Sequence, residues 1–345
     1  MHDLAEGICP RDVAKVLHYF ICAVKLFSLE ELNSRIRGFH YSLHDKFDKP
    51  PDITIARIKH GFLSMSSSEM FTFVRNLPVI IGDLVPEGTM PHWQVIIHLK
   101  ALIDIIMNKA HIPGTHDLLR TLITEYFVEI SELFPNFLTP KHHFLIHYPR
   151  LMAQMGPLCK LASMRYESKH REAKITSRVS NSRVNVCRTI AVKHQLKLNH
   201  RFMNYAPYAD YSHGPARKVI LTELPNFAEF SVALPSNISQ VVNVTEWIEF
   251  SGQRLKRNSV LVIGTRSGPN FFIIRTILLE KTHKIVLVAK TIKQCLFNVH
   301  YQAYEVLHAD EEEWRCSVWS RFRYAMRISH KVTVNNGSTF VIKNW

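Results

Sequence analysis

The spacing of hydrophobic residues changes once along the chain, near residue 206, and this change limits the fold more than any other sequence feature. Before it, apolar residues recur every three or four positions, as at Val13, Val16, Leu17 and Phe20, which is typical of a helix with one buried face. After it, short runs rich in β-branched and aromatic residues show period two and are separated by turn residues. The sequence therefore predicts an α+β protein, helical first and then a small all-β barrel or sandwich.

Four segments follow from this pattern. Residues 1–138 are expected to form a helical domain, and residues 139–205 a basic helical segment. Residues 206–218 hold two prolines and a glycine, which favours a linker, and residues 219–345 form the β domain. Strands are expected at Val241–Val244, Trp247–Phe250, Ser259–Ile263, Asn270–Leu278, Lys284–Thr291 and Gln302–Leu307.

Composition narrows the class of protein. A chain of 345 residues with 46% hydrophobic and 21% charged residues is typical of folded globular proteins. The six cysteines are dispersed and form no C-x-x-C pair, which favours a reducing compartment. No uncharged apolar run approaches the roughly 20 residues of a membrane span. We therefore expect a soluble protein of the nucleus or cytoplasm that has no membrane partner.

Positive charge is concentrated in the middle of the chain. Residues 1–138 carry 13 Lys and Arg against 16 Asp and Glu, residues 139–218 carry 15 against 3, and residues 219–345 carry 15 against 10. A basic block within a folded region is typical of a protein that binds a polyanion, most often nucleic acid. The alternative is a solvated basic face that only maintains solubility.

Three helices are expected within the basic block, at about residues 139–156, 164–176 and 186–202. Thr139 followed by Pro140 begins the first, and Gly156 ends it. Their surfaces would present a ladder of cations to DNA phosphates. The residues that we expect to bind DNA are Lys141, Arg165, Lys169, Arg171, Lys174, Arg178, Arg183, Arg188, Lys193, Lys197 and Arg201.

His143 and His147 stand one helical turn apart, so both imidazoles can point from one face and bind one metal ion, as many zinc sites require. Two ligands make half of a site. Folding would have to bring His170, Cys159 or Cys187 to them to add a ligand. The alternative interpretation is a pair of buried, hydrogen-bonded histidines on an apolar helix.

Glu167 is the one acidic residue between Glu132 and Glu172. Arg171 and His170 follow it at helical spacing, so a helical salt bridge is one interpretation. The other is a carboxylate that binds a divalent cation beside a phosphodiester. Two-metal phosphoryl transfer uses two or three carboxylates around ions about 4 Å apart, so Glu167 cannot perform it alone.

Four stretches resemble a known family. They are the opening MHDLAEG, the block KHHFLIHYP at residues 141–149, the block MRYESKHREAK at residues 164–174, and HYQAYEV at residues 300–306. The chain resembles the C-terminal half of transposases of the CACTA (En/Spm) group and the arthropod transposon-derived proteins related to them. The resemblance implies an RNase H-like core with a D-D-E triad that binds Mg²⁺ or Mn²⁺, interrupted before its last acid by a helical insertion.

On this resemblance Glu167 is the third acid of the triad, and His143 and His147 are half of a zinc site. Residues up to 138 would be the helical insertion, and residues 139–205 would end the core. The first two aspartates and a cysteine pair would precede Met1. We therefore expect no autonomous cleavage or strand transfer by this chain.

Three functions remain open from the sequence. The first is a transposon-derived DNA-binding protein that contacts the phosphate backbone. The second is a part of an active, metal-dependent transposase or nuclease whose upstream half is missing. The third is a protein-interaction or oligomerisation module, which includes a homo-oligomer.

Overall fold

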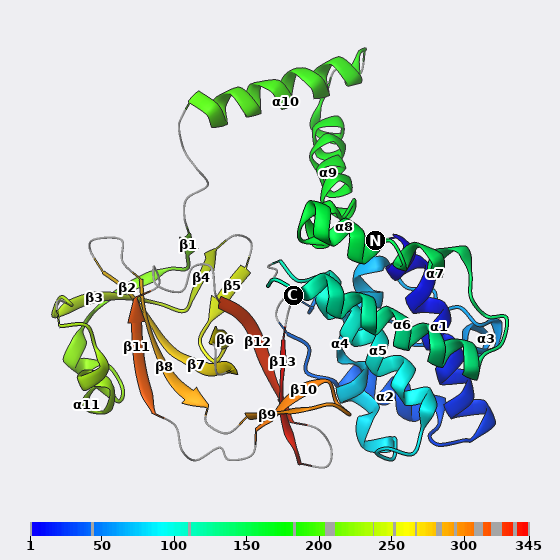
Figure 1. The fold of residues 1–345 in the computed structure, drawn as a ribbon. Helices are drawn as coiled ribbons and strands as arrows, with labels where there is room; N and C mark the ends of the chain where they lie inside the picture. Colours follow the sequence, from blue (N-terminus) through cyan, green and yellow to red (C-terminus); the bar gives the residue numbers. More distant parts are fainter. Residues whose placement is uncertain are drawn as a thin grey trace.

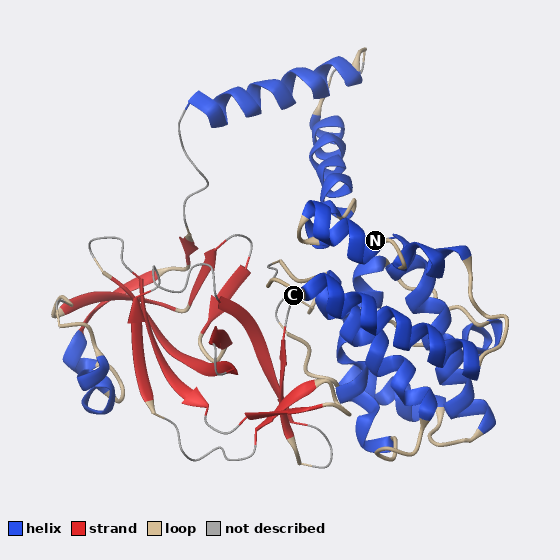
Figure 2. Ribbon diagram, in the orientation of Figure 1, coloured by secondary structure: helices blue, strands red, loops and turns tan. Residues whose placement is uncertain are grey.

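The computed structural model has an N-terminal helical body, a projecting pair of helices and a C-terminal antiparallel β part (Figures 1 and 2). This arrangement confirms the predicted α+β class and the predicted order of helices before strands. None of the described helices combines the length and the apolar composition of a membrane span. The residues that the structure describes are 2–42, 45–109, 112–181, 184–203, 211–236, 238–250, 253–265, 268–280, 285–292, 295–306, 313–318, 326–333 and 337–343.

The helical body packs around one hydrophobic core, to which all of its longer helices contribute. A capping box begins α4 (Ser67–Ile81): the Ser66 hydroxyl accepts from the backbone N–H of Glu69, whose carboxylate accepts from the backbone N–H of Ser66. The body consists of η1 (Leu4–Ile8), α1 (Cys9–His18), η2 (Tyr19–Ala23), α2 (Leu29–Gly38), α3 (Ile55–His60), α4 (Ser67–Ile81), η3 (Gly82–Leu84), α5 (Pro91–Ile106), α6 (Thr115–Leu133), α7 (Pro140–Leu145), α8 (Tyr148–Met155) and η4 (Leu158–Leu161).

The helix expected at residues 139–156 is two helices, α7 and α8, with a break at Ile146 and His147. Pro149 lies in the first turn of α8. Proline has no backbone N–H to donate to the carbonyl of Leu145, and its ring clashes with a preceding helical turn. The break therefore separates His143 from His147, which we had expected on one continuous helix.

Two further helices, α9 (Met164–Val179) and α10 (Val186–Met203), project from the helical body as an arm. Figure 1 shows α9 rising from the end of α8 and α10 running across the top of the molecule. Their bounds agree with the two helices predicted for this part of the basic block. Most described side chains of α10 are exposed and none of them is buried, so the arm lies outside the core of the helical body.

The β part forms one large antiparallel sheet with the path β11-β8-β7-β6-β12-β13-β10-β9, extended by β3 and β2, and a second sheet β1-β4-β5. Within the described residues no barrel closes, so the barrel alternative is not found. The strands are β1 (Ser212–His213), β2 (Ala216–Ile220), β3 (Val241–Thr245), β4 (Trp247–Phe250), β5 (Gln253–Lys256), β6 (Val260–Thr265), β7 (Gly268–Leu279), β8 (Ile285–Ile292), β9 (Cys295–Asn298), β10 (Ala303–Val306), β11 (Trp314–Val318), β12 (Met326–Thr333) and β13 (Thr339–Lys343).

Each of the six runs predicted as strands overlaps one strand of the β part, namely β3, β4, β6, β7, β8 and β10. The expected linker differs from the structure. Residues 212–213 and 216–218 within it form β1 and the start of β2, which pairs with β3. Residues 206–210 of the linker lie outside the described part of the chain.

The helical body and the β part are held together where the end of α4 meets the turn before β10. The Tyr301 ring packs against Gly82, and the His300 Nε2–H donates to the Gly82 carbonyl at 2.8 Å. The Trp93 indole N–H donates to the His300 carbonyl at 3.1 Å. Val79 shares a small core with Tyr301 and with residues of β12 and β13. The two parts of the chain therefore have a specific packed interface.

Gly82→Ala should lower the free energy of unfolding by about 1 to 3 kcal/mol, because a Cβ at Gly82 would lie 2.6 Å from Tyr301 Cε1. Gly38→Ala is the matched control: no atom lies within 4 Å of a Cβ at Gly38, which also ends a helix. Urea unfolding followed by circular dichroism measures both. Equal effects of the two substitutions would contradict the close packing of Tyr301.

Candidate nucleic-acid interface and metal ligands

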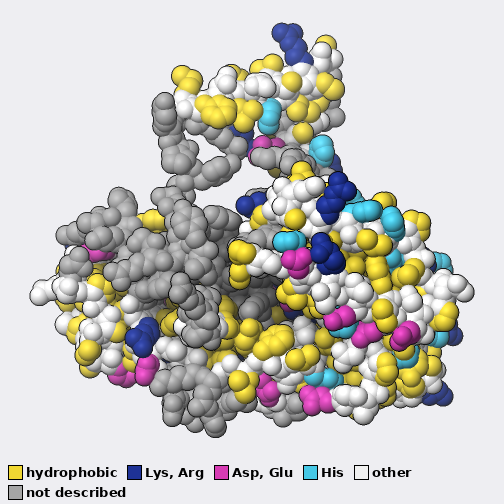
Figure 3. Space-filling view, in the orientation of Figure 1, with side chains coloured by type: hydrophobic (Ala, Val, Ile, Leu, Met, Phe, Trp, Pro, Cys, Tyr) yellow, Lys and Arg dark blue, Asp and Glu magenta, His cyan; other side chains and the backbone are white. Residues whose placement is uncertain are grey.

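The arm formed by α9 and α10 carries most of the cations predicted to contact phosphates. On its described surface the exposed members are Arg171, Lys174, Arg178, Arg188, Lys193 and Lys197. Figure 3 shows the arm standing clear of the body, so these helices are open to a long polyanion. The described acidic side chain on the arm is Glu172, which leaves an excess of positive charge there.

One ion pair links the two arm helices. Lys197 Nζ lies 3.0 Å from Glu172 Oε1, and both side chains are about half exposed. A pair with this exposure contributes little to stability, on the order of 1 kcal/mol or less. It connects α9 and α10 on the arm.

Several of the predicted residues fall outside what the structure describes. The side chains of Arg165, Glu167 and Lys169 belong to this group, although their backbone is part of α9. Arg183 and the side chain of Arg201 also lie outside the described residues. The predicted role of Glu167 as the third catalytic acid therefore stays a prediction.

Lys141 is placed differently from the other predicted cations. It lies in α7 on the helical body, where its Nζ donates to the Glu6 carbonyl at 2.9 Å and its stem covers Gly7. The segment around Glu6 is itself ordered by side chains, since Ser67 Oγ donates to Glu6 and His2 Nδ1 lies 2.7 Å from it. These two partners, Ser67 first, lower the pKa of Glu6. Lys141 thus joins α7 to η1 and lies apart from the arm.

His143 and His147 lie on the surface, with their Nε2 atoms 3.3 Å apart and their ring planes at 83°. Both side chains are exposed, so the alternative of two buried histidines is wrong for this pair. A hydrogen bond between two imidazoles requires one acceptor nitrogen, which only a neutral ring has. The same two nitrogens are close enough to bind one metal ion.

Among the described side chains, no further metal ligands are placed beside this pair. In the part of the chain that the structure describes, no group of three or more His, Cys, Asp or Glu side chains is placed to hold a metal ion. Cys159 donates instead to the Asn108 carbonyl at 3.3 Å. The residues described here therefore fit two positions of a zinc site and leave the other two unfilled.

The neighbouring His142 is the buried histidine, and it belongs to a network that the sequence analysis missed. His142 Nε2 lies 3.1 Å from Asp12 Oδ2, and the Tyr126 hydroxyl donates to the same carboxylate. Thr139 N donates to His142 Nδ1 at 3.0 Å, so His142 takes the place of the usual Glu in a capping box. With Nδ1 accepting, Nε2 carries the proton that is donated to Asp12.

Burial dominates the electrostatics of this network. Asp12, Tyr126 and His142 are at most 1% exposed. Desolvation raises the pKa of Asp12, although the hydrogen bond from His142 lowers it in part. Desolvation likewise raises the pKa of Tyr126. With no solvent access, the network has a structural role: it joins α1 to α6 and α7, which lie more than 100 residues further along the chain.

One sequence signal could have identified His142. The spacing Thr139-x-x-His142 is that of a capping box, in which the fourth residue must turn back toward the helix start. Leu145 and Met152 continue the same buried side of α7 and α8. The partner Asp12 gives no such signal, because an acid in the first turn of a helix is usually exposed.

Comparison of the chain with protein-family models, with curated proteins and with solved structures found no match.

Proposed function

We propose that this chain is a transposon-derived DNA-binding protein that holds the phosphate backbone with the arm of α9 and α10. The observation that carries the proposal is the row of exposed cations along both arm helices, with Glu172 as the described acid among them. Lysine and arginine on an exposed helix can reach successive phosphates of a duplex. The helical body, by contrast, has as many acidic as basic residues, with 16 of each over residues 1–161, and is a poorer surface for DNA.

The proposed contacts are mainly to phosphates. Contacts to phosphates supply affinity and orientation but little sequence discrimination. Each such contact releases bound counterions from DNA, so affinity should depend steeply on salt. The affinities for duplexes of unrelated sequence and equal length should therefore differ little.

The affinity for a duplex oligonucleotide should fall steeply between 50 and 300 mM NaCl. In a plot of the logarithm of the association constant against the logarithm of the salt concentration, each phosphate contact should contribute about −0.9 to the slope. Fluorescence anisotropy with a labelled duplex measures the slope. A slope between about −2.7 and −5.4 would correspond to contacts from three to six of the described arm cations. Affinity that is independent of salt would refute binding through phosphates.

The proposed activity is binding without autonomous cleavage or strand transfer. Two of the three carboxylates that the family resemblance requires are not among residues 1–345. In the proposal, Glu167 would bind Mg²⁺ or Mn²⁺, and His143 and His147 would bind Zn²⁺, only with ligands from outside this sequence. Such ligands would make the chain part of an active transposase.

A further inference from the structure

The two arm helices lack the packing that stabilises the helices of the body. Of the described side chains in α9 and α10, none is buried. Their larger apolar residues face solvent: Ile175 is 51% exposed, Val192 is 48% exposed and Leu196 is 62% exposed. Most of the stability of a helix in a protein comes from burying an apolar face against its neighbours. α9 and α10 therefore gain little free energy from packing.

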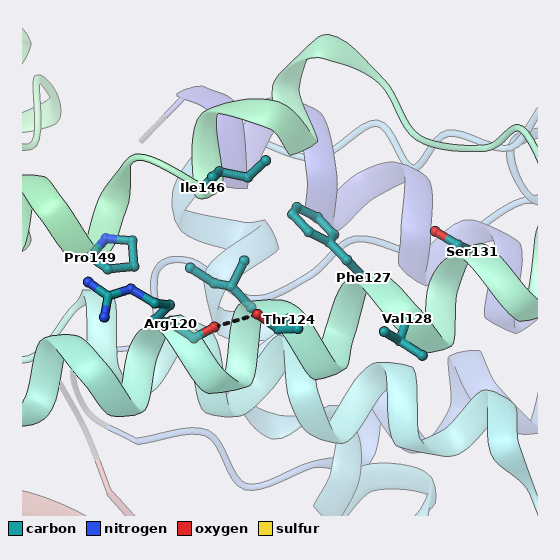
Figure 4. Close-up of a pocket in the computed structure, with 8 residues that line it drawn as sticks. Arg120, Thr124, Phe127, Val128, Ser131, Ile146 and Pro149 are labelled. Carbon is teal, nitrogen blue, oxygen red and sulfur yellow. Dashed lines mark hydrogen bonds between the residues drawn. The ribbon is translucent and has the colours of Figure 1, made fainter.

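α6 is a useful comparison, because it is almost equal in length to α10. α6 has 19 residues and α10 has 18. Figure 4 shows α6 beside the break between α7 and α8, with Phe127 turned toward Ile146. Four residues of α6, at spacings of three or four, are at most 4% exposed: Leu119, Ile123, Tyr126 and Ile130. The core of the helical body thus supports α6, whereas α10 lies outside it.

Charge repulsion further weakens the arm helices. In α9, Lys174 follows Arg171 by three residues and precedes Arg178 by four. In α10, Lys193 and Lys197 are four residues apart. Side chains at these spacings are neighbours on a helix, and like charges there destabilise it. The single ion pair between the two helices offsets only part of this repulsion. The cations that suit the arm to phosphates therefore disfavour its helices when no phosphate is bound.

The composition of the two helices adds no compensating stability. Helices only slightly shorter than these, of about 12 to 15 residues, are marginal in water even when they are rich in alanine. β-branched residues lose side-chain freedom in a helix and lower its stability. The arm carries several of them, namely Ile175, Thr176 and Val179 in α9 and Val186, Thr189, Ile190 and Val192 in α10. Each arm helix is therefore close to a balance between helix and coil.

We propose that the arm of the free protein exchanges between helix and coil, and that binding of a phosphate backbone converts it to helix. Phosphates beside the cations cancel their mutual repulsion, and the helical form presents these cations in rows. DNA therefore binds the helical arm more tightly and shifts the equilibrium toward it. The choice of DNA as the ligand rests on the proposed function. The equilibrium in the free chain does not, and it can be measured without DNA.

Hydrogen exchange of the free protein, followed by mass spectrometry of its peptides, tests the first half of the proposal. Peptides from α9 and α10 should exchange within about a hundredfold of the rate of an unfolded chain. Peptides from α5 and α6 should exchange more slowly than an unfolded chain by about a thousandfold or more, because the core protects them. Arm amides as slow as those of α6 would overturn the proposal.

The same measurement with an excess of a DNA duplex at low salt tests the second half. Exchange in the arm should slow by about tenfold or more. If anisotropy shows that the duplex binds while exchange in the arm is unchanged, the proposed function stands and this proposal is overturned. If the duplex binds at no salt concentration, the proposed function fails together with the second half, and fast exchange in the free arm still supports the first.

Substitutions at Val192 test the equilibrium through affinity. Among ordinary residues alanine favours a helix most and glycine favours it least. Val192→Ala should bind the duplex about twofold to fivefold more tightly than Val192→Gly, because affinity scales with the populated helical fraction. Val128 in α6 is the matched control, since it is 50% exposed on a helix that the core supports. Val128→Ala and Val128→Gly should bind equally well. Equal affinities of the two Val192 variants would mean that the helix is complete before DNA binds, and would overturn the proposal.

Discussion

Asp12→Ala should lower the free energy of unfolding by about 3 to 5 kcal/mol, because it leaves two buried donors without their acceptor. The Tyr126 hydroxyl and the His142 Nε2–H both point at the Asp12 carboxylate, and all three side chains are almost fully buried. Neither donor can turn to water when the carboxylate is removed. Urea unfolding followed by circular dichroism and tryptophan fluorescence measures the loss.

Two controls separate burial from the loss of charge. Tyr126→Phe removes one donor and leaves the His142 contact, so it should cost only about 1 to 2 kcal/mol. Asp117→Ala removes a carboxylate that pairs with Arg120 on the surface, where both side chains are about 60% exposed, and should cost less than about 1 kcal/mol. If Asp12→Ala cost no more than Asp117→Ala, the buried network would not be a stabilising element.

The pKa of Asp12 adds a dependence on pH. Burial raises this pKa in the folded chain above the usual 3.8, so protonation of Asp12 stabilises the fold at low pH. That contribution is lost as pH rises from the unfolded pKa through the raised folded value. Asp12→Asn keeps a neutral group at all pH values, so the stability of the unmodified chain relative to this variant should fall as pH rises. A rise would indicate an ion pair with a charged His142.

Replacing Lys174, Arg178 and Arg188 together by Gln should weaken DNA binding by about a hundredfold to a thousandfold near 0.1 M salt if each contacts a phosphate. It should also reduce the steepness of the log–log salt slope by about three. All three side chains are exposed on the arm, so the fold should be unchanged. Anisotropy titrations with the same duplex at several salt concentrations measure both effects.

The matched control for the arm is an equal change of charge elsewhere. Lys25, Arg57 and Lys59 are also exposed but lie on the helical body. Their joint replacement by Gln removes the same three charges from the protein, and it should change affinity by less than about threefold through the weaker long-range field. If both triple variants lost affinity equally, net charge rather than the arm would determine binding.

Much of the local structure could be predicted because it depends on residues close in sequence. The capping box at Ser66, the helices at 164–179 and 186–203 and the strand at 268–279 each follow from spacing over a few residues. Proline usually kinks or ends a helix, yet α4 continues through Pro78 to Ile81. There the surrounding core offsets the lost backbone hydrogen bond.

The candidate site was predicted less completely than the fold. The cations at Arg171, Arg178 and Arg188 are exposed on the arm as expected, since a helix without an apolar stripe has no face to bury. The two histidines expected to be buried or to bind metal are exposed, and His142 beside them is buried. The buried side of α7 and α8 runs through His142, Leu145 and Met152, and His143 and His147 lie on the exposed side.

By itself the sequence determined the order of helices and strands, the concentration of positive charge and the positions of most helix ends, because these depend on chemistry over a few neighbouring residues. Tertiary structure decided which distant residues meet, such as Asp12 with His142 and Gly82 with Tyr301. Such contacts depend on how complete helices and sheets pack around a shared core, and residue spacing along the chain contains no measure of that packing.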